Sequence, residues 1–308
     1  MKRSRAIAAL AGGAALSLPR FARAQATTVR IGTLLTDNYC MGYYAQDGGF
    51  FGRSGLSIEL TPFSNGAAMA AACAGGSIDV GTGESTELAN GVIRGLPFVI
   101  VAGGALWSAD APTTFLCVAR NSTIRTAKAL EGATIAVPAL VSLSATAVKA
   151  WLAQGGADLT KVRFVELKPP EMAEALSRGT IDAAHLSEPP FSFGLDLIVP
   201  IAEPQDTIAK RFLISNWFAT RDWLAHNPES AQRLVAAAYE TARWANTHHA
   251  DTLLILAKYA KLDVSRLQTM KRATYATSLD ARLMQPVLDA GFQFGALPRR
   301  LNAADLVR

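Results

Sequence analysis

Short apolar runs alternate with helical patterns, and the clearest example lies in the first third of the chain. Residues 78–80 (Ile-Asp-Val) predict a short buried strand, and residues 98–102 predict the next one. Gly81 and Gly83 follow the first strand and would let the backbone turn sharply and approach another group closely. Ser85 then provides an N-cap for a helix. The order strand, glycine turn, helix, strand predicts a βαβ unit.

Similar units recur along the chain and predict an α/β fold. Further strands are expected at residues 29–35, 57–63, 114–119, 134–137, 162–167, 181–186, 197–201 and 212–220. Helices are expected at residues 43–51, 67–74, 85–93, 145–154 and 171–178, and a long one begins at Pro228. Asp79 and Asp182 occupy equivalent places in two of the units, which predicts a twofold repeat of topology without a repeat of sequence.

Polar side chains gather where predicted strands end and helices begin. Such crevices at the carboxyl ends of strands are where open α/β sheets bind ligands, and helix N-termini offer free N–H groups to them. The candidate ligand-binding residues at these positions are Ser64, Asn65, Gly83, Ser85, Ser142 and Ser144. Each serine or asparagine among them could equally be an ordinary helix cap.

Two glutamates follow predicted strand ends, one in each unit, and allow three interpretations. Glu84 and Glu188 could act together as an acid and a base, which would make the protein an enzyme. They could instead be first-turn carboxylates stabilised by helix dipoles, or partners for an amine or N–H of a ligand. His185 is a further cleft candidate, although a buried histidine with satisfied hydrogen bonds is just as plausible.

The net charge of +5 does not indicate a nucleic-acid-binding protein. Five of the 30 basic residues lie in the first 24 positions, which contain no acidic residue, so 25 basic residues remain against 25 acidic ones. Those first positions have the order of a secretory leader: a basic start, an apolar segment at residues 6–18, and small residues before a cleavage site. We therefore expect residues 1–26 to be a signal peptide and the mature protein to be periplasmic.

The sequence shows no pattern of a catalytic or metal-binding motif. Cys40, Cys73 and Cys117 have spacings unlike those of a metal site, and their odd number precludes complete pairing, so they are expected to be small buried side chains. His248 and His249 are adjacent on a helix and point in different directions, which disfavours a shared metal. We expect no catalytic residue, no metal and no cofactor.

Several segments, taken in order, resemble the periplasmic solute-binding proteins of ABC importers. They are Val-Arg-Ile-Gly at 29–32, Phe-Gly-Arg-Ser-Gly-Leu-Ser-Ile at 51–58, Gly-Ser-Ile-Asp-Val-Gly at 76–81, Arg-Gly-Leu-Pro at 94–97, Leu-Glu-Gly-Ala-Thr-Ile-Ala-Val at 130–137 and Gly-Thr-Ile-Asp-Ala-Ala at 179–184. The branch that these segments resemble binds nitrate, sulfonates, taurine and thiamine-pyrimidine precursors. The resemblance covers roughly residues 29–228, and its specificity lies in the order and spacing of the segments.

The resemblance implies a two-lobed periplasmic-binding-protein fold of type II, the transferrin-like arrangement, with a ligand cleft between the lobes. Residues 27–118 with 213–308 would form one lobe and residues 119–212 the other, joined by two hinge strands that include residues 114–119. It adds Asn38 and Tyr39 as candidates in the first loop and places Asn216 and Trp217 near the cleft floor.

The function implied is capture of a small polar organic solute, similar to a sulfonate, taurine or a pyrimidine, and its delivery to a membrane permease. The expected protein is a monomer that performs no chemistry and binds no nucleic acid. An enzyme on the same fold, resembling thiamine-pyrimidine synthase, is the alternative. If Glu84 or Glu188 faces the cleft, a ligand with nitrogen donors is expected in preference to nitrate or a simple alkanesulfonate.

Overall fold

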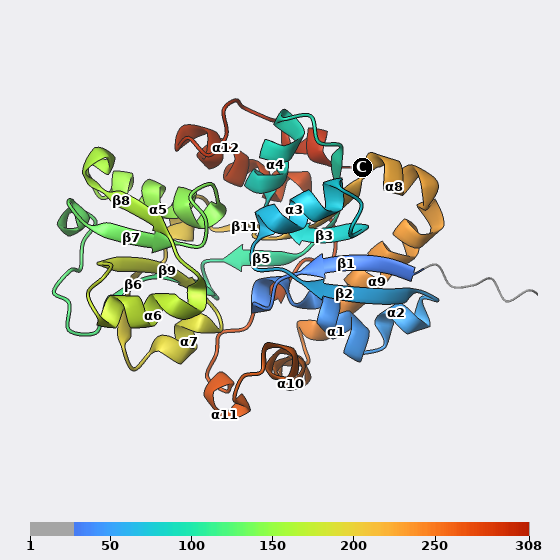
Figure 1. The fold of residues 1–308 in the computed structure, drawn as a ribbon, viewed down its shortest axis with the longest axis horizontal. Helices are drawn as coiled ribbons and strands as arrows, with labels where there is room; N and C mark the ends of the chain where they lie inside the picture. Colours follow the sequence, from blue (N-terminus) through green and yellow to red (C-terminus); the bar gives the residue numbers. More distant parts are fainter. Residues whose placement is uncertain (1–27, 308) are drawn as a thin grey trace, which may run out of the picture.

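Two five-stranded sheets form the centres of two lobes that lie side by side in the computed structural model, which describes residues 28–307 (Figure 1). The predicted signal peptide, residues 1–26, lies outside the described residues. The fold is α/β, as the alternating pattern predicts, and it has the two-lobed form expected from the resemblance.

The first sheet has the strand order β2-β1-β3-β12-β4. Its strands are β1 (Thr28–Thr33), β2 (Ser57–Pro62), β3 (Val80–Gly83), β4 (Phe98–Gly103) and β12 (Asn216–Thr220). Strand β1 pairs in parallel with β2 and β3, whereas β12 runs antiparallel between β3 and β4. Apolar side chains cover both faces of this sheet, which explains why its central strands read as continuous apolar runs.

The second sheet repeats this topology with the strand order β8-β7-β9-β6-β10. Its strands are β6 (Thr114–Ala119), β7 (Thr134–Val137), β8 (Arg163–Glu166), β9 (Ala183–Ser187) and β10 (Ile198–Ala202). Asp79 accepts a hydrogen bond from the main-chain N–H of Arg30 at 2.8 Å, and Asp182 accepts the equivalent bond from Thr134 at 2.7 Å. The predicted twofold repeat of topology is therefore confirmed.

Helices cover both faces of each sheet. The first lobe carries α1 (Met41–Asp47), α2 (Phe50–Arg53), α3 (Gly66–Ala74), α4 (Ser85–Ile93), α8 (Arg221–His226) and α9 (Pro228–Ala245). The second lobe carries α5 (Leu143–Gln154), α6 (Pro169–Ser177) and α7 (Pro190–Gly194). Helix α5 buries its apolar side on one face of the second sheet, and α6 and α7 cover the other face. No helix between residues 28 and 307 has both the length and the apolar character required to cross a bilayer.

A small third sheet lies where the chain passes between the lobes. Strand β5 (Ala105–Ser108) pairs antiparallel with β11 (Arg211–Leu213) and with β13 (Thr274–Tyr275), and Figure 1 shows β5 between the two halves of the molecule. The expected hinge strand, β6, instead pairs with β9 and β10 inside the second sheet. That expectation is wrong because an apolar extended segment has the same pattern in a hinge and in a sheet. The expected strand 212–220 is likewise divided into β11 and β12.

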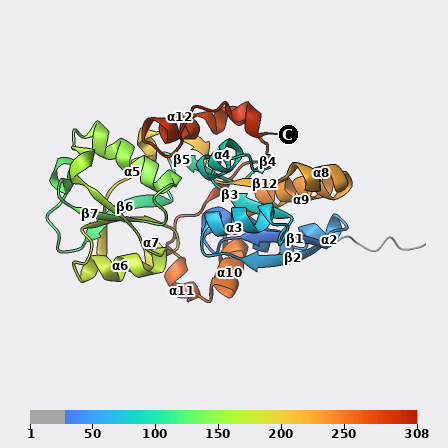
Figure 2. The ribbon, with the colours of Figure 1, turned by 45° about the horizontal axis from the view of Figure 1, so that its top comes forward.

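The C-terminal helices extend from the first lobe to both sides of the second (Figures 1 and 2). They are α10 (His249–Ala260), α11 (Val264–Leu267) and α12 (Gln285–Gln293). Helix α11 contacts α7, where the Arg266 guanidinium donates to the main-chain oxygen of Phe193 at 2.7 Å, and α12 contacts α5. The second lobe is thus touched by the first on two sides besides the connecting strands.

Candidate functional site

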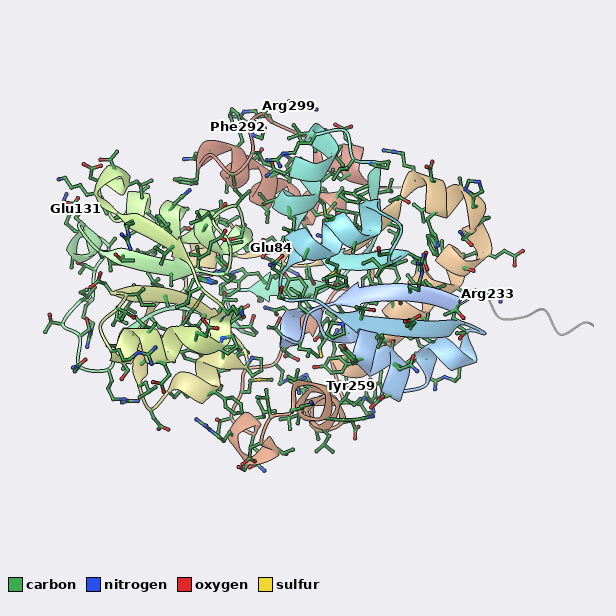
Figure 3. The ribbon with its side chains drawn as sticks, in the orientation of Figure 1. Glu84, Glu131, Arg233, Tyr259, Phe292 and Arg299 are labelled. Atoms are coloured by element: carbon green, nitrogen blue, oxygen red, sulfur yellow. The ribbon has the colours of Figure 1, made fainter. Side chains whose placement is uncertain are left out.

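A cavity of about 640 Å³ lies between the lobes and takes its walls from both. The first lobe contributes Tyr39, Phe63 and Glu84, and the second contributes Ser142 and Phe193. Figure 3 shows Glu84 at the place where the two lobes meet. A molecule in this cavity would contact both lobes simultaneously.

The loop after β1 brings two predicted residues, Asn38 and Tyr39, to the cavity wall. Asp37 fixes this loop, because its buried carboxylate accepts hydrogen bonds from the Arg272 guanidinium at 2.8 Å and from the N–H of Ala273 at 2.7 Å. Two parts of the chain that are more than 230 residues apart therefore hold the same loop in place.

Ser64 and Asn65 also line the cavity, at the start of α3. The Asn65 side chain is the N-cap of this helix and accepts from the N–H of Ala68 at 2.9 Å. A Cβ atom at Gly66 would collide with the Glu87 carboxylate, so that carboxylate lies directly against the first residue of the helix. The structure thus places both residues in the wall, and the Asn65 side-chain oxygen is already bonded to its own helix.

The predicted turn at Gly81 and Gly83 is displaced. Both glycines lie within β3, and Gly83 pairs with Asn216 and does not line the cavity. The close approach is real, since a Cβ at Gly81 would lie 2.6 Å from the Phe218 ring. The chain turns one residue later, so the N-cap is Glu84; Ser85, expected to be the cap, is buried behind the wall.

Glu84 connects the two lobes directly. One carboxylate oxygen accepts from the Tyr39 hydroxyl at 3.2 Å, and the other accepts from the main-chain N–H of Leu143 at 2.7 Å. Leu143 is the first residue of α5 in the second lobe, so the carboxylate of one lobe lies at a helix N-terminus of the other. Glu84 occupies the N-cap position of α4, but its side chain makes no cap hydrogen bond to that helix.

Ser142 and Ser144 line the cavity from the second lobe. The Ser142 hydroxyl is the N-cap of α5 and accepts from the N–H of Ala145 at 3.1 Å. The same hydroxyl donates to the main-chain oxygen of Ala139 at 2.7 Å, which ties the preceding loop to the helix.

Two candidates of the second lobe lie outside the cavity wall. Glu188 accepts from the N–H of Ser192 at 3.1 Å and from that of Lys271 at 3.2 Å, so it serves as a helix-end carboxylate and a tie to the C-terminal segment. His185 is buried with Nε2 against the Gln205 side chain, and only Gln205 reaches the cavity. His185 lies within β9 and Glu188 directly follows it, as predicted, but neither residue is part of the cavity wall.

Asn216 and Trp217 form no part of the cavity wall, because both are completely buried in the first lobe. The Asn216 amide donates to the Ser85 hydroxyl at 2.9 Å, behind the wall, and Trp217 packs in the core. Strand β12 lies between β3 and β4 inside a sheet that is covered on both faces, so the prediction that these two residues lie near the cleft floor is wrong.

Several wall residues were not predicted as site residues from the sequence, among them Glu87, Thr114 and Phe193. Glu87 stands three positions after Glu84 on α4, and this spacing, which places two side chains on one face of a helix, could have revealed it. Thr114 is 4% exposed, and its hydroxyl has no hydrogen-bond partner among residues 28–307. Phe193 could not be predicted, because a phenylalanine in a short helix is expected to be a buried core residue and not part of a binding site.

Burial dominates the electrostatics of the wall. It raises the pKa of Glu84, and burial together with the nearby Glu84 carboxylate raises the pKa of Glu87 to about 8. Burial also raises the pKa of Glu188 to about 7 and lowers that of His185 to about 4. Glu84 and Glu87 are therefore carboxyls whose charged form is disfavoured by burial.

The described part of the chain shows no group of three His, Cys, Asp or Glu side chains arranged to hold a metal ion. Cys40, Cys73 and Cys117 are buried free thiols, and burial raises the pKa of each. Their positions agree with the expectation of small buried side chains.

Comparison with known proteins places this geometry in a family. A binding protein of Brucella abortus (strain 2308) is 25% identical over 265 residues, covering 82% of this chain and 77% of its own. The taurine-binding periplasmic protein of Escherichia coli (strain K12) is 29% identical over 144 residues, covering 46% and 43%. The alkanesulfonate-binding protein SsuA of Xanthomonas axonopodis pv. citri, bound to MOPS, superimposes with a TM-score of 0.76 at 19% identity, covering 91% and 98%.

Two of these neighbours bind taurine and an alkanesulfonate, as the resemblance of the sequence segments indicated, and the last of them has the same two-lobed fold. The model of the NMT1-like family matches residues 22–260, which is most of the chain. The protein therefore belongs to the NMT1-like family.

Proposed function

We propose that this protein is the periplasmic binding component of an ABC importer, which captures an organic solute between its lobes and delivers it to a membrane permease. The observation that carries the proposal is the cavity of about 640 Å³ walled by both lobes. A solute that contacts both walls favours the closed arrangement by its differential affinity for that state, and no chemistry is required.

The relatives support solute capture as the common activity. They include a taurine-binding periplasmic protein and an alkanesulfonate-binding protein, both of which bind small polar organic molecules. We propose the same broad class for this chain, with the protein acting as a monomer and the permease as its macromolecular partner.

The enzyme alternative depended on Glu84 and Glu188 acting together, and their positions do not support this. An acid–base pair needs both groups at one bound substrate. Glu84 lines the cavity, whereas Glu188 is bonded to Ser192 and Lys271 and is absent from the wall. Capture without chemistry is therefore the function that the geometry favours.

Mass spectrometry of protein purified from the periplasm tests this proposal with two readouts. Under denaturing conditions, the intact mass should correspond to a chain beginning between Gln25 and Thr27. Under native conditions, a fraction should carry an additional organic mass that is lost on denaturation. Absence of the protein from the periplasm, with Met1 retained on the cytoplasmic protein, would refute the proposed function, as would a purified protein that never retains a solute.

A further inference from the structure

Five helices begin at the cavity, and their N-termini would ordinarily favour an anion. Four of them, α3, α4, α5 and α6, are longer than two turns, and the fifth is the short helix α7. The first turns of all four already carry acceptors or acids of this chain, or lack the N–H group. This local chemistry distinguishes the cavity from an anion site.

Helix α5 shows the effect most clearly. Ser142 accepts its Ala145 N–H, and Glu84 of the opposite lobe accepts its Leu143 N–H at 2.7 Å. An anionic ligand at this helix end would have to displace a carboxylate that is part of the protein.

The other three helix ends are equally unsuited to an anion. At α3, Asn65 accepts the Ala68 N–H, and the Glu87 carboxylate lies against Gly66. The first turn of α4 carries Glu87 and follows Glu84 directly. Helix α6 begins with Pro169 and Pro170, which have no N–H to offer.

Charged side chains in the wall do not restore the balance. Glu84, Glu87 and Glu174 line the cavity, and Lys168 is the one basic side chain in the wall, which consists of described residues only. The Lys168 side chain is 76% exposed and has Glu171 within 4.0 Å, so water and a carboxylate already screen it. The buried carboxyls of the wall, Glu84 and Glu87, therefore have no buried basic side chain beside them in this wall of described residues.

The remainder of the wall is mainly apolar and too large for a small ion. Phe63, Leu143, Phe193, Leu197 and Ile214 line it with several prolines. Volumes of about 300–1,000 Å³ are typical of sites that enclose drug-sized molecules with apolar bodies. The unpartnered Thr114 hydroxyl, buried in this wall, provides one more polar contact for such a molecule.

We infer that the solute is an amphipathic organic amine, with an ammonium or N–H group at Glu84 and Glu87 and an aromatic or branched alkyl body against the apolar wall. The inference rests on the proposed function and narrows its solute class. Taurine, nitrate and short alkanesulfonates lack the apolar body, and the last two also lack the donor.

A matched pair of probes tests the inference by isothermal titration calorimetry at pH 7.5: 3-phenylpropylamine and 3-phenylpropane-1-sulfonate, which share one skeleton. The amine is expected to bind at least tenfold more tightly than the sulfonate. Glu84→Gln should weaken amine binding at least tenfold, and Thr114→Val should weaken it by a smaller factor. The control Glu59→Gln removes an equal charge from an exposed position on β2, outside the wall, and should leave amine binding unchanged.

Equal or tighter binding of the sulfonate would overturn the inference, as would an amine affinity that Glu84→Gln and Glu59→Gln affect equally. Binding of neither probe at millimolar concentration would overturn it as well. The solute recovered from the purified protein then separates the two proposals. A recovered anion leaves solute capture standing and removes the amine, whereas a protein without solute removes both.

Discussion

At the scale of the residue, Glu87 carries the clearest pH dependence. Its pKa is raised from 4.5 to about 8, chiefly by burial and then by the Glu84 carboxylate, while Tyr39 is the other titratable group facing this pair. Between these two pH values the folded protein holds a proton that the unfolded chain has released. The free energy of unfolding therefore falls as the pH rises from about 4.5 to about 8, and it levels off above that.

Glu87→Gln should remove this dependence. Each pKa unit corresponds to about 1.4 kcal/mol. The free energy of unfolding of the variant, measured relative to that of the wild type, should therefore be roughly 2 to 4 kcal/mol higher at pH 8.5 than at pH 5. Urea denaturation at the two pH values measures the gain. Glu188, whose pKa is raised to about 7, also makes the free energy of unfolding fall as the pH rises. This contribution is the same in the wild type and the variant, so it cancels when the two are compared. A wild-type-to-variant difference that is the same at both pH values would contradict the prediction.

The buried ion pair between Asp37 and Arg272 gives a second test at this scale. The two side chains are 1% and 9% exposed, and removal of one charge leaves the other uncompensated. Asp37→Asn should lower the free energy of unfolding by about 3–5 kcal/mol in chemical denaturation. The exposed pair Arg233 and Glu229 supplies the control, since Glu229→Gln should cost less than about 1 kcal/mol. Similar losses in the two variants would show that Asp37 is not a structural anchor.

Single residues also show where prediction from sequence ends. The position of Glu84 at a strand end follows from the local pattern, and the structure places it in the cavity wall. The local pattern could not predict that the Glu188 carboxylate bonds to Ser192 and Lys271, because Lys271 lies far away in the chain. Thr114 was assigned to a strand, but its unpartnered hydroxyl depends on packing that no sequence window contains.

At the scale of the element, helix α5 is fixed at its start by Ser142. Ser142→Ala should lower the free energy of unfolding by about 1 kcal/mol, because the N–H of Ala145 loses its acceptor. Thermal or urea denaturation measures the loss. Ser144→Ala is the matched control in the same turn, and it should change stability by less than about 0.5 kcal/mol. Equal effects of the two substitutions would mean that the cap contributes nothing.

Most elements could be predicted, because a strand and a helix impose different apolar periods on the sequence. Their pairing was harder to predict. The repeat of Asp79 and Asp182 indicated two similar units, and the sheets confirm it. Strand β6 was assigned to the hinge because its own pattern does not specify its neighbours. Helix α12 was not among the predicted helices, because packing against the rest of the fold and not its own sequence stabilises so short a helix.

At the scale of the whole molecule, three kinds of contact hold the lobes together. They are the short paired strands β5 and β11, the C-terminal contacts of Arg266 and α12, and the hydrogen bond from Leu143 to Glu84. A solute in the cavity adds contacts to both walls. We therefore expect the lobes to move as bodies, with little change inside either sheet.

Small-angle X-ray scattering tests this closure most directly. The protein freed of solute by unfolding and refolding should have a larger radius of gyration than the same protein saturated with the solute recovered from it. A cavity-filling variant, Ala139→Trp, should show no such change, because its wall residue would occupy the space of the solute. An unchanged radius of gyration in the wild type, with saturation proven by calorimetry in the same sample, would contradict capture by closure between the lobes.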